Sequence, residues 1–422
     1  MEPIVECCAG LDVHQASVVA CVMHGPTGKK PRKELLTFGT THDELIRLRD
    51  ELTTRGCTLV AMESTGVYWQ PVHAVLEDRF DVIVGNAYRI RNVPGRKTDV
   101  KDAEWICDLA RHGLIARGFV PQRPIRELRE LTRYRRKLVE AASAERNRLI
   151  KLLESAGIKL AGVVADVFGV SGEAMIRAMI DGDQSPAEMA QLARARMRRK
   201  IPELERALRG DIGEHHRFIL RLQLNRIKAA DADLAALDQR IATKLAPYDD
   251  ALSRLSGIPG VDRVNAATII AEIGVDMSQF HGAHHLASWA GLCPGSHASA
   301  GRKRGGKTRR GNIFLKAALV TAAVTAAKAR GTYFAEKYRR LCARRGKLRA
   351  AVAVGHRILL AVYHMLADGT FYRDPGAAFL DNLDTRRVSN QLVRRLNAMG
   401  FNVTLTPKAL DPPQTPTGHA TS

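Results

Sequence analysis

The sequence is poor in the features that mark secreted, zinc-binding and membrane proteins. It holds seven cysteines, an odd number, scattered over 422 residues without a C-x-x-C pair. Neither a disulfide framework nor a zinc site is therefore indicated. No apolar run approaches the roughly 18 uninterrupted residues of a membrane-spanning helix, and the first residues lack the zones of a signal peptide. We expect a protein of the reducing cytoplasm with no membrane partner.

Aromatic residues are also scarce, at 5% of the chain, whereas positive charge is abundant, with a formal net charge of +21. Stacking on unpaired bases is thus less favoured than contact with a phosphate backbone. Residues 1–115 hold 14 Lys and Arg against 16 Asp and Glu, a net charge of −2, which leaves +23 on the remainder. A near-neutral domain joined to a strongly basic remainder predicts separate roles, the basic part being suited to polyphosphate.

Short apolar runs in residues 1–119 predict an α/β domain within a chain of two to four domains. Strands are expected at Ile4–Leu11, Ala16–Met23, Lys33–Gly39, Thr58–Met62 and Asp81–Gly85. Helices are expected at Thr41–Thr53, Val67–Glu77 and Asp99–His112. The predicted order is three strands, helix, strand, helix, strand, helix.

Four acidic residues fall where such a domain can bring them together. Asp12 and Glu63 follow two of the predicted strands, at the strand ends where α/β sheets bind their ligands. Asp99 and Asp102 stand three apart at a helix start, so their carboxylates share one face. Each acid alone has a structural explanation in a turn or a helix start. Together they repel one another unless a cation lies between them, which predicts a site for Mg²⁺, or for Mn²⁺ in its place.

Two groups of basic residues lie beside this candidate chemistry. Lys97 and Lys101 alternate with the aspartates and either hold a neighbouring phosphate or only neutralise the helix face. Residues 301–312 hold six cations and four glycines, so that charge and backbone can both approach phosphate closely. Nucleic-acid contacts are expected from Arg302, Lys303, Arg304, Lys307, Arg309 and Arg310.

Two serines, Ser296 and Ser299, stand immediately before this basic stretch. A serine hydroxyl is a poor nucleophile without strong electrostatic help, which neighbouring guanidinium groups can supply. On the residues alone, the serines are either nucleophile candidates or ordinary turn residues in a basic loop.

The remainder of the chain is predicted to be mostly helical. Residues 120–247 carry two long helical patterns, Arg123–Leu153 and Arg217–Leu245, which suit a coiled-coil dimerisation region or a plain antiparallel hairpin. In residues 248–375, the turn Gly257–Gly260 is similar to a helix-hairpin-helix, whose backbone N–H groups bind phosphate, or is an ordinary connection. Further helices are expected at Ile313–Ala329, Tyr333–Arg345 and Lys347–Leu366. Residues 376–422 form an extension with a small helix and strand in Arg386–Leu405 and disorder from about 409.

Several motifs, in this order, resemble one known family. The Asp-Glu-Asp-Asp set is similar to that of the RuvC-like branch of the RNase H fold. The segments at Glu63–Tyr68, Pro94–Ala103, Gly257–Gly260 and Ala290–Asn312 resemble those of transposases of insertion-sequence family 110, including its 1111 subgroup. The resemblance covers about residues 4–375.

This resemblance implies a multidomain α/β plus all-α protein that excises and inserts its own mobile element. It implies that two metal ions are bound by Asp12, Glu63, Asp99 and Asp102. It also implies a covalent serine nucleophile in a C-terminal transposase domain, where the Ser-Ala-Gly context favours Ser299 and leaves Ser296 as the fallback.

The implied partners are double-stranded donor and target DNA, a non-coding bridge RNA that selects both, and further copies of the chain in a dimer or tetramer. The RuvC-like and serine halves of the site would then come from different subunits. The alternatives are a metal-dependent, junction-resolving nuclease that uses only the four acids, and a non-enzymatic nucleic-acid scaffold.

Overall fold

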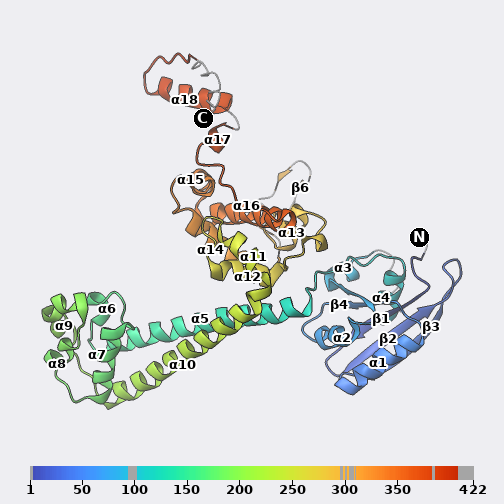
Figure 1. The fold of residues 1–422 in the computed structure, drawn as a ribbon, viewed down its shortest axis with the longest axis horizontal. Coiled ribbons are helices and arrows are strands. Elements are labelled where there is room, and N and C mark those ends of the chain that lie inside the picture. The colour runs from blue at the N-terminus through green and yellow to red at the C-terminus, as the bar shows by residue number, and fades with distance from the viewer. Residues whose placement is uncertain are drawn as a thin grey trace, which may run out of the picture. The chain divides into compact units, whose positions relative to one another are not determined.

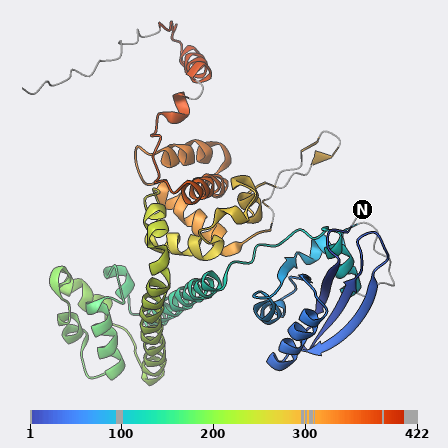
Figure 2. The ribbon, with the colours of Figure 1, turned by 45° about the vertical axis from the view of Figure 1, so that its right-hand side comes forward.

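The chain divides into two units, Met1–Gln122 and Arg123–Ser422, which can be followed by colour in Figures 1 and 2. The computed structural model describes residues 3–93, 102–294, 298–299, 302–303, 308, 310–382 and 385–406. The predicted boundaries at 119, 247 and 375 stay predictions.

A five-stranded sheet of order β3-β2-β1-β4-β5 forms the centre of the first unit. Its strands are β1 (Cys7–Val13), β2 (Ser17–His24), β3 (Arg32–Gly39), β4 (Leu59–Glu63) and β5 (Asp81–Gly85). The first three are antiparallel neighbours, whereas β4 pairs parallel to β1 and β5 parallel to β4. The predicted mixed α/β sheet is confirmed. Strand β1 lies further along the chain than predicted, so Asp12 is inside the strand and not beyond its end.

Side-chain alternation along β1 separates two hydrophobic layers. Ala9, Leu11 and Val13 face a core shared with helices α1 (His42–Thr54) and α2 (Trp69–Leu76). Cys8 faces the opposite core, which is shared with α4 (Asp102–Arg111) and the short α3 (Ala87–Arg91). Helix α4 therefore covers one face of the sheet, and α1 and α2 cover the other.

Two long helices, α5 (Arg123–Ser155) and α10 (Glu214–Leu245), lie side by side in the second unit (Figure 1). Glu127 near the start of α5 pairs with Lys244 near the end of α10, whereas Arg146 further along α5 pairs with Asp231 earlier in α10. Within the chain the two helices are thus an antiparallel hairpin, the simpler of the two predicted forms. The dimerisation role stays a prediction.

Short helices that lie between these two in the sequence pack against the end of α5 and the start of α10, around a core that includes Met175, Ile176 and Leu204. They are α6 (Leu160–Val163), α7 (Val170–Asp181), α8 (Pro186–Gln191), η1 (Ala195–Lys200) and α9 (Ile201–Ala207). The basic helix predicted near residues 194–200 is the 3₁₀ helix η1.

The C-terminal part of the second unit is a helical bundle with a short hairpin inserted in it (Figure 2). Its helices are η2 (Ala246–Tyr248), α11 (Asp249–Ser256), α12 (Arg263–Ile273), η3 (Met277–Gln279), α13 (Ala283–Trp289), α14 (Ile313–Ala326), α15 (Tyr333–Arg345) and α16 (Lys347–Asp368). The hairpin strands are β6 (Ala298–Ser299) and β7 (Arg302–Lys303). The helices predicted after Asn312 are confirmed as α14, α15 and α16.

The last described elements are α17 (Phe379–Asn382) and α18 (Thr385–Ala398). The predicted terminal helix therefore forms. The strand predicted before Leu405 is wrong for the described residues 399–406, which adopt no regular structure, because a strand is stabilised by pairing with a neighbour.

Helix α16 is the one described helix whose length and apolar composition would allow it to cross a membrane. It contacts α13, α14 and α15, and residues along its length, such as Val354, Ile358 and Val362, are fully buried. Gly355 lets it lie close to the backbone of Leu319 in α14. These contacts are those of the central helix of a bundle.

Candidate active site

Strand pairing brings Asp12 and Glu63 together at the C-terminal ends of β1 and β4. These strands are parallel, with Leu11 opposite Met62, so Asp12 and Glu63 occupy the next position along each strand. Alternation puts both side chains on the face that carries Cys8 and Leu59, which is the face covered by α4. Ligands of α/β sheets bind at such strand ends.

Helix α4 begins with Asp102 and lies close above β1. Gly10 permits this approach, since a Cβ atom there would lie 2.4 Å from the carbonyl oxygen of Ala103 and 2.2 Å from the backbone nitrogen of Cys107. The first residue of α4 is thereby held near the ends of β1 and β4. Three of the four predicted acids, Asp12, Glu63 and Asp102, thus belong to elements that meet on one face.

The electrostatics of Asp12 reflect this gathering. Burial raises the pKa of its carboxyl group, and the charges of Asp102 and Glu63 raise the pKa further, while His14 lowers it. The His14 ring nitrogen Nε2 lies 3.2 Å from Asp12 Oδ2. The Thr65 hydroxyl donates a hydrogen bond of 2.6 Å to Glu63 Oε1. A partly buried carboxylate that is repelled by two others is a donor set suited to a hard divalent cation.

The fourth predicted acid, Asp99, lies outside the described residues together with Lys97 and Lys101. Among the residues that the structure does describe, no group of three or more His, Cys, Asp or Glu is arranged closely enough to hold a metal ion. Of the three described acids, Glu63 and Asp102 lie within electrostatic range of Asp12.

Ser299 lies in the short hairpin of the second unit. Strand β6 pairs antiparallel with β7, so that Ser299 is opposite Arg302 and Ala298 is opposite Lys303. Arg310 is exposed. Four other predicted residues of this segment lie outside the described residues: Ser296, Arg304, Lys307 and Arg309. The backbone thus gives the serine a basic residue as its cross-strand partner.

Two family models match separate parts of the chain. One, of the DEDD type and described as Transposase, matches residues 9–158 and so contains Asp12, Glu63, Asp99 and Asp102. The other, described as Transposase IS116/IS110/IS902 family, matches residues 252–339 and contains Ser299. The chain carries the transposase domains of the IS110 family.

Two relatives are also transposases by name. A protein of Pseudomonas aeruginosa (strain PAO1), named as a family 20 transposase, is 26% identical over 324 residues, which are 75% of this chain and 86% of that protein. A protein of Sinorhizobium fredii (strain NGR234), named as transposase y4pF/y4sB, is 28% identical over 145 residues, 33% of this chain and 37% of that protein. The chain is thus an enzyme of DNA transposition, and DNA is its substrate. The DEDD type of the first domain points to the use of divalent metal in general terms.

The predicted helix-hairpin-helix turn of the transposase joins α11 to α12. Gly260 has a positive φ of 86°, and a Cβ atom there would lie 2.3 Å from the carbonyl oxygen of Ala322 in α14. Packing against α14 thus accounts for this glycine, and phosphate binding by the turn stays a prediction.

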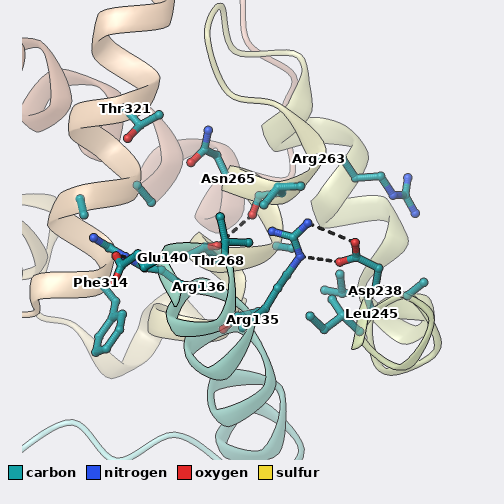
Figure 3. Close-up of a pocket in the computed structure, with 18 residues that line it drawn as sticks. Arg135, Arg136, Glu140, Asp238, Leu245, Arg263, Asn265, Thr268, Phe314 and Thr321 are labelled. Atoms are coloured by element: carbon teal, nitrogen blue, oxygen red, sulfur yellow. Dashed lines mark hydrogen bonds and ion pairs between the residues drawn. The ribbon is translucent and has the colours of Figure 1, made fainter. Parts of the chain in front are cut away.

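A groove of about 460 Å³ lies between α5, α10, α12 and α14 of the transposase (Figure 3). Its walls include Val139, Ile241 and Val264. Each arginine of the lining pairs with an acid: Arg135 with Asp238, Arg136 with Glu140, and Arg263 with Asp249, which lies outside the lining. Arg135 Nη2 donates to Asp238 Oδ2 at 3.1 Å, as the dashed lines in Figure 3 mark. Because each of these arginines is paired within the chain, we assign no nucleic-acid contact to the groove.

Gly10, His14 and Thr65, which position or contact the acids, were not among the predicted site residues. The last two follow the acids at a spacing of two residues, as Asp12-x-His14 and Glu63-x-Thr65. That spacing is a usable signal, since side chains two apart after a strand can turn back toward the same edge. No local pattern marks Gly10, because the helix that needs a glycine there, α4, follows more than ninety residues later in the sequence.

Proposed function

We propose that this transposase excises and inserts its element by metal-assisted strand cleavage with a serine nucleophile, under the guidance of a bridge RNA. The observation that supports the proposal is that Asp12, Glu63 and Asp102 belong to elements on one face of the sheet, where the charges of Glu63 and Asp102 raise the pKa of Asp12. With Asp99 they would hold Mg²⁺, one or two ions, or Mn²⁺ instead. A bound ion would supply Lewis-acid stabilisation of the charge that develops on the phosphoryl oxygens.

The remaining chemistry belongs to the chain. The Ser299 Oγ attacks the scissile phosphorus, a new Oγ–P bond forms and the bond to one deoxyribose oxygen breaks. The proton of the serine hydroxyl passes to the leaving oxygen. Strand exchange then reverses these bonds on a second DNA end. The cross-strand neighbour Arg302 and the basic residues after it are suited to binding the phosphate backbone.

The division of labour follows the charge distribution and the fold. We assign catalysis by the acids to residues 1–119, spacing and dimerisation to 120–247, the serine transposase domain to 248–375, and an extension to 376–422. Lys97, Lys101 and the six cations of residues 301–312 would bind nucleic acid. The enzyme works in the cytoplasm as a homo-oligomer, a dimer or tetramer, in which the two halves of the site come from different subunits.

A strand-exchange assay with the element's own junction DNA and co-expressed flanking RNA tests this proposal. Ser299→Ala and Asp102→Ala should each abolish exchange while DNA binding in a gel-shift assay persists. If the Ser299→Ala protein nicks DNA by hydrolysis as fast as the wild type cleaves it, a nuclease that uses only the acids is favoured. Normal strand exchange by Asp102→Ala would contradict the metal mechanism. Strand exchange in the absence of the flanking RNA would contradict guidance by an RNA.

A further inference from the structure

Glu272, at the C-terminal end of α12, is a completely buried carboxylate. Arg133 of α5 donates two hydrogen bonds to it, from Nε to Oε1 at 2.7 Å and from Nη2 to Oε2 at 2.8 Å. Arg129, one turn earlier, donates to the backbone carbonyl groups of Ala271 and Glu272. Two cations of α5 are thus committed to the end of α12.

Asn312 joins this ion pair to the first turn of α14. Its Nδ2 donates a 2.6 Å hydrogen bond to Glu272 Oε2. Its Oδ1 accepts from the backbone N–H groups of Phe314 and Leu315 at 3.1 and 3.0 Å, so the same side chain caps the helix. We call Glu272, Arg133 and Asn312 the Glu272 clamp.

Asn312 is also the point at which the hairpin that carries Ser299 returns to the bundle. Pro294 and Thr308 form a bridge between the outgoing and returning chain. Lys316 donates to the Thr308 hydroxyl at 2.6 Å and to the Gly291 carbonyl oxygen at 3.4 Å, so one amine ties both sides. Where the chain returns at Gly311, a Cβ atom would lie 2.4 Å from the backbone nitrogen of Gly291. The base of the hairpin is therefore fixed at both sides.

A buried ion pair is a poor way to gain stability, because apolar side chains of similar size usually stabilise a core as well or better. What such a pair can supply is one defined geometry, since each hydrogen bond is made only in one arrangement. We infer that Glu272 is a positioning residue for Ser299: through Asn312 it fixes where the serine hairpin returns to the bundle, and through Arg133 it couples that position to α5. This inference rests on the proposed role of Ser299.

The substitution Asn312→Asp tests the clamp without removing the cap. Asp is as good an N-cap as Asn, but the new carboxylate would replace the donor that faces Glu272 with a second negative charge. We expect the affinity for junction DNA to stay close to that of the wild type, while the melting temperature falls, because the new carboxylate faces the buried charge of Glu272. The single-turnover rate of serine–DNA adduct formation should fall by about 100-fold, the size of loss that a misplacement of roughly 1 Å can cause.

The matched control is Asp276→Asn, the reverse exchange at an exposed position just after α12. Asp276 is the N-cap of η3, where its side chain accepts a hydrogen bond from the backbone N–H of Ser278. This control variant should leave the rate of adduct formation unchanged. In the double variant with Glu272→Gln and Asn312→Asp, the new amide at position 272 again faces an acceptor at position 312. Its rate of adduct formation should be at least tenfold higher than that of the single Asn312→Asp variant. The rate is measured well below the melting temperature of each variant, where a purely structural role predicts a rate close to that of the wild type in both.

Two results would overturn the inference: an unchanged adduct rate in Asn312→Asp, or a double variant as slow as the single one. The outcome for Ser299 is read separately. If the wild type makes no adduct and Ser299→Ala exchanges strands normally, the serine mechanism fails whatever the clamp variants do. If the wild type makes the adduct and Asn312→Asp makes it equally fast, only the positioning role fails.

Discussion

Gly10 of β1 lies directly beneath Cys107 of α4, so closely that a Cβ atom on the glycine would be 2.2 Å from the cysteine's backbone nitrogen. Backbone atoms of Ala103 approach the same point. Because Asp102 precedes Ala103 and Asp12 follows Gly10 by two residues, this contact sets the distance between two of the proposed metal ligands. The absence of a side chain at position 10 is thus a requirement of the candidate site.

The variant Gly10→Ala should therefore lose both stability and strand exchange. The added methyl group meets backbone, which cannot rotate away, so the helix must move. Overpacking of this kind costs about 1–3 kcal/mol of the free energy of unfolding, to be measured by denaturant unfolding. Gly28→Ala is the control, since nothing lies within 4 Å of a Cβ atom there. A Gly10→Ala protein that is destabilised but exchanges strands normally would show that the position of α4 is not critical.

Replacing Asp12 with Asn should separate stability from activity. In buffer with EDTA, Asp12→Asn removes a partly buried charge that is repelled by Glu63 and Asp102, so its melting temperature should exceed that of the wild type. Strand exchange should fall by at least ~100-fold, because a catalytic metal contributes several kcal/mol to lowering the barrier. Added Mg²⁺ should raise the melting temperature of the wild type more than that of the variant. Equal responses of both proteins to Mg²⁺ would argue against a metal bound at Asp12.

Thr65 should tune metal binding through Glu63. Its hydroxyl donates to Glu63 Oε1, and loss of such outer partners typically costs 10- to 100-fold in metal affinity or activity. Thr65→Val should therefore raise the Mg²⁺ concentration for half-maximal exchange by about tenfold. Thr65→Ser, which keeps the hydroxyl, should behave like the wild type. The idea fails if Val and Ser at position 65 give the same Mg²⁺ dependence.

Much of the first unit followed from local patterns in the sequence. Alternating and continuous apolar runs indicated all five strands, and acids at the ends of two of them indicated a site on one edge. The packing of α4 could not be predicted, because it depends on backbone contact between Gly10 and Cys107. The start of β1 was misplaced because Ile4 and Val5 extend the apolar run beyond the residues that pair with β2.

The second unit shows the same division between local and distant information. Helical spacing predicted α5, α10 and the helices after Asn312, but it could not distinguish a hairpin from a coiled coil between chains. The antiparallel pairing depends on contacts such as Lys244 with Glu127, more than a hundred residues apart. Glu272 looked like an ordinary residue within a helix, since its partners Arg133 and Asn312 lie far away on either side.

The most direct test of the account is to identify the atom that becomes bonded to DNA. The full-length transposase, with its flanking RNA, would be incubated with junction DNA and Mg²⁺ and quenched in denaturant. Digestion with nuclease and protease would then allow the linked peptide to be sequenced by mass spectrometry. The account predicts a nucleotide esterified to Ser299, absent in Ser299→Ala and in Asp102→Ala. Cleaved DNA with no covalently linked peptide, or a nucleotide attached to another residue, would contradict it.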